Sequence, residues 1–216
     1  MPPEMTNIPI ALPEHAREPL LRAVAQIRRD TKRDRLCVGI CGCHHAVGSS
    51  TITINMAHQA ATNWQESVLL IEGNKRSPSF SSYFKLDADT GFSEYLSGSC
   101  DIDEIIHTPS DASFKIITSG TDKRPLAIRN LPGLMASINK KAEMSFIDLP
   151  PVLPYTEAAE LASCLDGVIL VIRSEQDKWE VAKAAAQLLE KSGARLLGTI
   201  LNRKQYYIPS WLYPLL

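Results

Sequence analysis

One segment of the chain combines residue types that could bind phosphate. The sequence HHAVGSST occupies residues 44–51 and stands between an apolar run and a helical pattern. Loops that bind nucleotide phosphates need glycine where backbone N–H groups converge, a lysine for the terminal phosphates, and a Ser or Thr hydroxyl for Mg²⁺. Gly48, Ser50 and Thr51 stand where such a loop requires them, but Ser49 occupies the lysine position. The segment is therefore half of a phosphate-binding motif.

The same segment also has an ordinary structural interpretation. A turn between a strand and a helix, with a glycine and a capping serine, would contain the same residues. On this segment alone we favour that turn, because no lysine lies between Leu36 and Ile71. The loop thus lacks the charge that phosphoryl transfer directs at the phosphate oxygens. The start of the helix would still offer N–H groups and its positive dipole end to an anion.

A carboxylate after a later apolar run is the second candidate. Asp148 follows the run 144–147 and precedes Pro150 and Pro151. The carboxyl ends of parallel strands meet at one edge of a sheet, where ligands collect. There a carboxylate beside a phosphate loop can hold Mg²⁺ directly or through water. The alternative is an aspartate that caps a turn before the two prolines.

The elements that would position these residues alternate along the chain. Apolar runs with strand character lie at residues 36–41, 68–71, 114–117, 144–147, 168–172 and 196–201. Helical patterns lie at residues 14–29, 50–62, 92–96, 102–106, 128–140, 156–164 and 175–191. Continuous apolar runs are typical of strands buried on both faces. The alternation predicts an α/β fold with a doubly wound, mostly parallel sheet flanked by helices.

Length and composition limit the class of protein. The 216 residues, 44% of them apolar, predict one domain over 36–203, an N-terminal arm and helix over 1–35, and an aromatic tail over 204–216. The formal net charge of -1 argues against a general nucleic-acid binder. Five cysteines, an odd number, favour the reducing cytosol. Without a signal-peptide pattern or roughly 18 consecutive apolar residues, we expect a cytoplasmic protein.

Several motifs together match one known family in order and residue type. They are GSST at 48–51, EGNKRSPS at 72–79, GFSEYLSG at 91–98, TSG at 118–120, DLPP at 148–151, DGVILVIR at 166–173 and LGTILN at 197–202. The resemblance is to the cytoplasmic P-loop domain of bacterial tyrosine autokinases, which control polysaccharide polymerisation and export. It covers roughly the last five-sixths of the chain and implies a P-loop NTPase-like fold of the SIMIBI type.

The resemblance also assigns roles to residues of this chain. It implies a nucleotide site, for ATP or ADP with Mg²⁺, made by Gly48, Ser49, Ser50, Thr51 and Asn202. Ser50 and Asp148 match the residues that hold Mg²⁺. The catalytic positions of the family correspond to Asp148, Glu72 and Asn74.

The residues that differ from the family pattern lie at its catalytic positions. The catalytic lysine is Ser49, and the two aspartates of the second motif are Glu72 and Asn74. One carboxylate is thereby lengthened and the other is made neutral. We therefore expect lost or weak phosphoryl transfer, while nucleotide binding stays open. Lys75 and Arg76 follow directly and are candidates to replace the missing charge, which the sequence does not decide.

The C-terminal tail contains Tyr206, Tyr207 and Tyr213. In the family, tyrosines at this end are phosphorylated in trans, so these three are candidate phosphoacceptors. A strap of aromatic side chains that packs on the domain is the alternative that we favour. Docking to a partner or a membrane surface is a third.

The family also implies partners. It works with a membrane-bound polysaccharide chain-length regulator (copolymerase), which would hold this protein at the inner face of the cell membrane. Its ring-forming Glu-x-x-Arg-x-x-Arg helix is not reproduced, because Leu21 and Val24 follow Glu18 in that register. A homo-oligomer, a hetero-oligomer or a monomer therefore stays open.

We therefore expect a kinase-like P-loop protein that regulates or scaffolds exopolysaccharide synthesis and export. The alternative is an active ATP-dependent autokinase that phosphorylates its own C-terminal tyrosines. Partitioning and division-site ATPases share the expected fold, but they carry an extra early lysine in the loop, which this sequence lacks.

Overall fold

The computed structural model describes residues 12, 14–31, 33–64, 66–86, 89–110, 112–124 and 131–203. The strands are β1 (Leu36–Gly42), β2 (Val68–Glu72), β3 (Lys115–Ile117), β4 (Met144–Asp148), β5 (Gly167–Arg173) and β6 (Leu196–Asn202). The helices are α1 (Glu14–Thr31), α2 (Ser49–Trp64), α3 (Phe80–Phe84), α4 (Phe92–Ser97), α5 (Leu131–Asn139), α6 (Thr156–Ser163) and α7 (Trp179–Lys191), with a 3₁₀ turn η1 (Ile102–Glu104).

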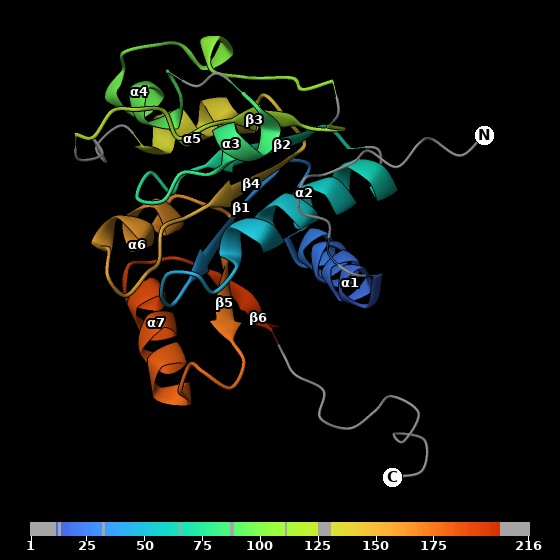
Figure 1. Ribbon diagram of the computed structural model, residues 1–216, viewed down its shortest axis with the longest axis vertical. Coiled ribbons are helices and arrows are strands. Elements are labelled where there is room, and N and C mark those ends of the chain that lie inside the picture. Colours follow the sequence, from blue (N-terminus) through green and yellow to red (C-terminus); the bar gives the residue numbers. More distant parts are fainter. Residues whose placement is uncertain are drawn as a thin grey trace.

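The six strands form one sheet in the order β3-β2-β4-β1-β5-β6, and all five pairings between them are parallel. Helices cover both faces of this sheet (Figure 1). Side chains from α1, α2 and α3 pack on one face, and side chains from α4 to α7 pack on the other. The α/β fold with a parallel sheet is therefore confirmed.

The sequence located every strand, but it misplaced some helix ends. Helix α7 begins at Trp179 rather than at residue 175, because Glu175 has a positive φ of 66° and the segment after β5 is a turn. The Asp177 carboxylate closes that turn by accepting the N–H of Arg173 at 2.7 Å. The short helix α3 was not predicted. The predicted start of α5, at residues 128–130, lies outside the described residues.

Helix α1 packs against α2. Its apolar stripe of Leu20, Val24 and Ile27 is buried with residues of α2 and the sheet. An ion pair of 2.9 Å between Arg28 and Glu66 ties the last turns of α1 to the segment after α2. In the parts of the chain that the structure describes, no helix is long and apolar enough to cross a membrane.

The central strands bring the carboxyl ends of β1, β2 and β4 together. In the register of the sheet, Asp148 of β4 lies beside Ile40 of β1 on one side and Glu72 of β2 on the other. The loop after β1 leads directly into α2, so the first turn of α2 lies above this edge. This edge is where an open parallel sheet binds ligands.

Candidate functional site

The loop between β1 and α2 is shaped by a glycine and an asparagine from distant parts of the chain. Gly48 has a φ of 91°, in the region that favours glycine. Asn202, at the end of β6, donates its side-chain N–H to the Val47 carbonyl at 2.7 Å. A Cβ on Gly48 would come within 2.4 Å of that same amide nitrogen. The loop therefore needs glycine both for its backbone angle and for the space that Asn202 fills.

A serine at the start of α2 bonds to a buried carboxylate. The Ser50 hydroxyl donates to Oδ2 of Asp148 at 2.6 Å. Burial, together with a smaller effect of the neighbouring Glu72, raises the pKa of Asp148 to about 7, although hydroxyl bonds from Ser50 and Ser49 oppose the shift. Among the described residues, Oδ1 of Asp148 has no hydrogen-bond partner. The site thus keeps one carboxylate oxygen available inside the protein.

Glu72 lies beside Asp148, but its carboxylate is bound by backbone N–H groups. Oε1 accepts the N–H of Ser79 and, at 2.8 Å, that of Phe80. Oε2 accepts the N–H of Ser119 at 3.1 Å. Burial raises the pKa of Glu72, and these N–H bonds limit the rise. The side chain therefore connects the end of β2 to the start of α3 and to the turn after β3.

The two cations after β2 have partners outside the phosphate loop. Lys75 donates its ammonium to the Arg124 carbonyl. Arg76 binds both carboxylate oxygens of Glu157, at 2.9 and 3.2 Å, and its guanidinium lies 4.9 Å from the centre of the Tyr155 ring. The Tyr155 hydroxyl is in turn 3.1 Å from Nε2 of His45. These contacts connect the rim of the loop to α6. Both cations are thus engaged elsewhere, and Ser49 occupies the position where the family has its lysine.

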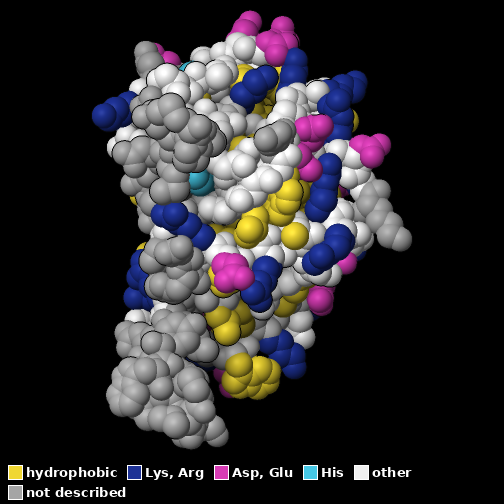
Figure 2. Space-filling view, turned by 90° about the vertical axis from the view of Figure 1, so that its right-hand side faces the viewer, with side chains coloured by type: hydrophobic (Ala, Val, Ile, Leu, Met, Phe, Trp, Pro, Cys, Tyr) yellow, Lys and Arg dark blue, Asp and Glu magenta, His cyan; other side chains and the backbone are white. Residues whose placement is uncertain are grey.

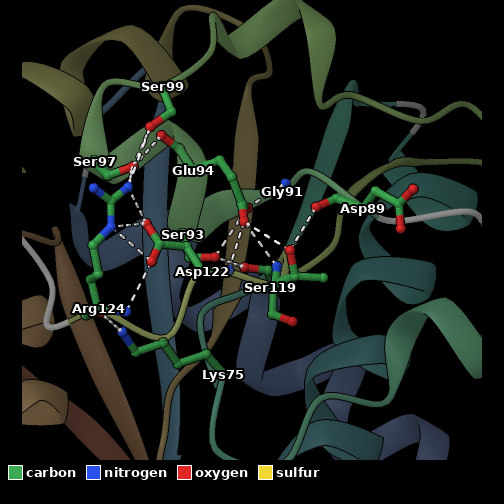
Figure 3. Close-up of polar contacts among 11 residues, drawn as sticks. Lys75, Asp89, Gly91, Ser93, Glu94, Ser97, Ser99, Ser119, Asp122 and Arg124 are labelled. Carbon is green, nitrogen blue, oxygen red and sulfur yellow. Dashed lines mark hydrogen bonds and ion pairs between the residues drawn. The ribbon is translucent and has the colours of Figure 1, made fainter.

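The structure also shows a polar cluster for which the sequence had suggested no role (Figure 3). Glu94 of α4 accepts the N–H groups of Gly91, Thr121 and Asp122 at 2.8, 2.9 and 2.6 Å. Burial disfavours its charge, but these N–H bonds outweigh it and lower the pKa of Glu94. Gly120, with a φ of 75°, passes so close that a Cβ would lie 1.7 Å from Oε2 of Glu94. Gly91, in the motif at 91–98, and Gly120, in the motif at 118–120, were the signal in the sequence that could have indicated this contact.

The predicted site residues fall into three groups. In the first group Ser50 bonds to Asp148, Asn202 bonds to the residue before Gly48, and Ser49 is the first residue of α2. Thr51 is in the first turn of α2, where its carbonyl accepts the Asn55 side-chain N–H at 2.8 Å. Asn74 is buried near the edge, and its Oδ1 has no partner within the described residues. The third group, Tyr206, Tyr207 and Tyr213, lies outside the described residues.

Comparisons with known proteins show which proteins the chain is similar to in sequence and fold. No protein-family model matches the chain. The tyrosine-protein kinase CpsD of Streptococcus agalactiae is 27% identical over 176 residues, which cover 79% of this chain and 76% of that protein. The chain is therefore similar in sequence to the bacterial tyrosine kinase family. The matching part is the P-loop domain of the family.

Solved structures show the same architecture. The kinase domain of the Escherichia coli tyrosine kinase ETK superposes with a TM-score of 0.77 at 21% identity, over 88% of this chain and 79% of that one. The septum site-determining protein MinD of Pyrococcus horikoshii, solved in complex with Mg-ADP, has a TM-score of 0.68 at 22% identity, over 82% and 75% of the two chains. At these identities the likeness shows the fold alone, which is that of P-loop NTPases.

Removing the Glu72 carboxylate should destabilise the protein. Glu72→Ala leaves the N–H groups of Ser79, Phe80 and Ser119 without their acceptor, and an unsatisfied buried donor costs about 1–3 kcal/mol. We expect chemical denaturation to show a loss of at least about 2 kcal/mol in the free energy of unfolding. Glu190→Ala, on the exposed side of α7, is the matched control and should change it by less than about 0.5 kcal/mol. Equal losses in the two variants would contradict the anchoring role.

The buried Asp148 carboxylate should make stability depend on pH. Because its pKa is raised to about 7 in the folded state, the folded protein retains this proton longer than the unfolded chain does. The stability that the protonated Asp148 contributes is fully present below about pH 4 and is lost as the pH rises through 7. In a chelator without nucleotide, we expect Asp148→Asn to stabilise the protein by on the order of 2–4 kcal/mol at pH 8. That gain should fall by at least half at pH 5, and a gain independent of pH would be inconsistent with a buried titrating carboxylate.

Proposed function

We propose that this chain is a kinase-like P-loop protein that binds a nucleotide with Mg²⁺ and regulates or scaffolds exopolysaccharide synthesis and export. Phosphoryl transfer by this site is lost or weak. One observation carries the proposal. Asn202 bonds to the loop beside Gly48 and Ser50 bonds to Asp148, as a nucleotide site of this type would require, whereas the cation position holds a serine. The neighbouring cations Lys75 and Arg76 have partners elsewhere.

The oxygens at the edge of the sheet fit a magnesium ion. Mg²⁺ is bound in phosphate sites by one or two protein oxygens together with phosphate oxygens and water. Ser50 and Asp148 supply a hydroxyl and a carboxylate, and Oδ1 of Asp148 and Oδ1 of Asn74 are buried acceptors that no described residue satisfies. Bound there, the ion would neutralise Asp148 and connect it to the phosphates. MinD, which shares the fold, was solved with Mg-ADP, and this supports the same class of ligand here.

The weakness of transfer follows from charge. In P-loop enzymes the lysine contacts the β- and γ-phosphates and stabilises the charge that develops on them. Ser49 offers a neutral hydroxyl in that place. Glu72, whose position is an aspartate in the family, uses both of its oxygens for backbone N–H groups, so its carboxylate is engaged in structure. The chain therefore retains groups that bind nucleotide and lacks those that accelerate transfer.

The second candidate is an active autokinase. The S. agalactiae relative is named a tyrosine-protein kinase, and the tail contains Tyr206, Tyr207 and Tyr213 as candidate acceptors. In either case we propose the same partner class, a membrane-bound polysaccharide chain-length regulator at the inner face of the membrane. The motifs shared with the family, at 72–79, 91–98 and 148–151, support that assignment.

Nucleotide binding can be tested by thermal unfolding. With Mg²⁺ and ADP at about 100 times the dissociation constant, a ligand that binds only the folded state stabilises it by about 2.7 kcal/mol, or several degrees. Gly48→Ala should abolish this shift, because its Cβ meets the Asn202 amide. Gly193→Ala is the matched control. Gly193 also has a positive φ, of 87°, but nothing lies within 4 Å of its Cβ position, so this variant should keep the shift. A wild-type protein that ignores ADP and ATP would overturn the nucleotide site and leave scaffolding alone.

Transfer can be tested by restoring the lysine. With labelled ATP and Mg²⁺, we expect the wild-type protein to form little or no phosphotyrosine, and Ser49→Lys to raise the rate at least about tenfold, because one aligned charge is worth about 100- to 1000-fold in comparable sites. Adding Asp148→Ala to Ser49→Lys should remove the gain. Rapid labelling of the wild-type protein that Asp148→Ala abolishes would instead establish the active autokinase.

A further inference from the structure

A groove far from the phosphate loop separates helix α1 from the last strand. It has a volume of about 280 Å³. Ala23, Ile27 and Asp30 of α1 line one side, and Ile169 with residues 195–200 line the other. The side of the molecule that carries α1 faces the viewer in Figure 2, where hydrophobic side chains lie between those of Lys and Arg. The groove is therefore a partly apolar opening on an otherwise charged side.

Strand β6 forms the wall of this groove, and it is an edge strand. It pairs with β5 alone in the sheet that the structure describes. Its outer backbone N–H and C=O groups are thus available to another extended segment. Gly198, in the middle of the strand, has no atom within 4 Å of its Cβ position, and Leu201 is 60% exposed. An edge with an open glycine and an exposed leucine is suited to a further apolar strand.

The chain itself supplies such a segment directly after β6. Arg203, the residue after the strand, has a φ of 56°, which turns the backbone away from the strand direction. The following residues 205–216, QYYIPSWLYPLL, contain no charged side chain, and eight of the twelve are aliphatic or aromatic. Burying such a segment removes a large apolar area from water. The segment thus begins at the edge that it would cover.

We propose that residues 204–216 of the same chain fold back along β6 and fill the α1–β6 groove. A four-residue turn at 203–206, which begins at the positive φ of Arg203, starts an antiparallel pairing in which Trp211 lies opposite Gly198 and Ile208 lies opposite Leu201. The large indole then occupies the space that the glycine leaves. Pro209 is compatible with this arrangement because an outer edge strand can do without an N–H that faces solvent.

This docking has a consequence for the tail tyrosines. Tyr206, Tyr207 and Tyr213 are held against the domain that carries them, so they are withheld from any kinase until the tail is released. The proposal depends on the edge of β6 and the groove, and not on the phosphate loop, so it stands or falls independently of nucleotide binding.

Hydrogen exchange of the full-length protein tests the docking. In the wild-type protein we expect the outward N–H groups of β6 and those of residues 206–213 to be protected. Trp211→Ser should accelerate exchange in both segments at least tenfold. Trp179→Ser is the matched control, since Trp179 is 66% exposed on α7 and should affect neither.

A second pair of variants tests the groove from its other side. Gly198→Arg places a long charged side chain in open space and should also expose residues 206–213, while Gly133→Arg, at an equally open glycine on α5, should not. Protection that Trp211→Ser and Gly198→Arg both leave unchanged would overturn the proposal. Protection that increases with protein concentration would also overturn it, because the occupant would then be the tail of a second copy.

Discussion

The rest of the site depends on a carboxylate, Asp148, that the fold buries without an ion-pair partner among the described residues. Asp148 ends the strand next to β1, so its side chain lies under the first turn of α2 and next to Glu72. Two carboxyl groups at adjacent positions of one sheet edge repel each other when both are charged, and burial adds to that cost. Glu72 is stabilised by three backbone N–H groups. Asp148 has the Ser50 hydroxyl on one oxygen and keeps the other without a partner in the described structure. A cation is the partner that would balance this arrangement.

Glu72 has one more carbon than the aspartate of the resembled family, and its carboxylate has a structural role. Its carboxylate reaches the start of α3 and the turn after β3, two segments that no ladder hydrogen bond joins. Glu94 holds the same turn from the opposite side through the N–H groups of Thr121 and Asp122. Lys75 adds a third connection through the Arg124 carbonyl (Figure 3). The turn is thus held by charged side chains from β2, from α4 and from the segment after β2.

The sequence predicted the fold more completely than it predicted the site. Strands such as residues 144–147 were found because a strand buried on both faces needs a continuous apolar run. The start of α7 was missed because periodicity continues through Glu175, where only the positive φ reveals a turn. The contact between Ser50 and Asp148 could be expected from parallel strand ends. The contact between Asn202 and Val47 could not be worked out from spacing, because it joins residues 155 positions apart through one side-chain rotamer.

In the proposed function, the affinity of the phosphate loop for a nucleotide is separate from its ability to transfer a phosphoryl group. Affinity comes from groups that the backbone fixes, namely the N–H groups at the start of α2 and the oxygens of Ser50 and Asp148. Reactivity needs a positive charge that stabilises the negative charge developing on the transferred phosphoryl group. Replacing a single side chain is enough to remove it. Arg76 is held by Glu157 and by the Tyr155 ring, so recruiting it to the phosphate would break a bidentate ion pair. Because each of these contacts also supports α6 or the loop rim, moving Arg76 to the phosphates would disturb both, which supports the proposal of a bound nucleotide without efficient transfer.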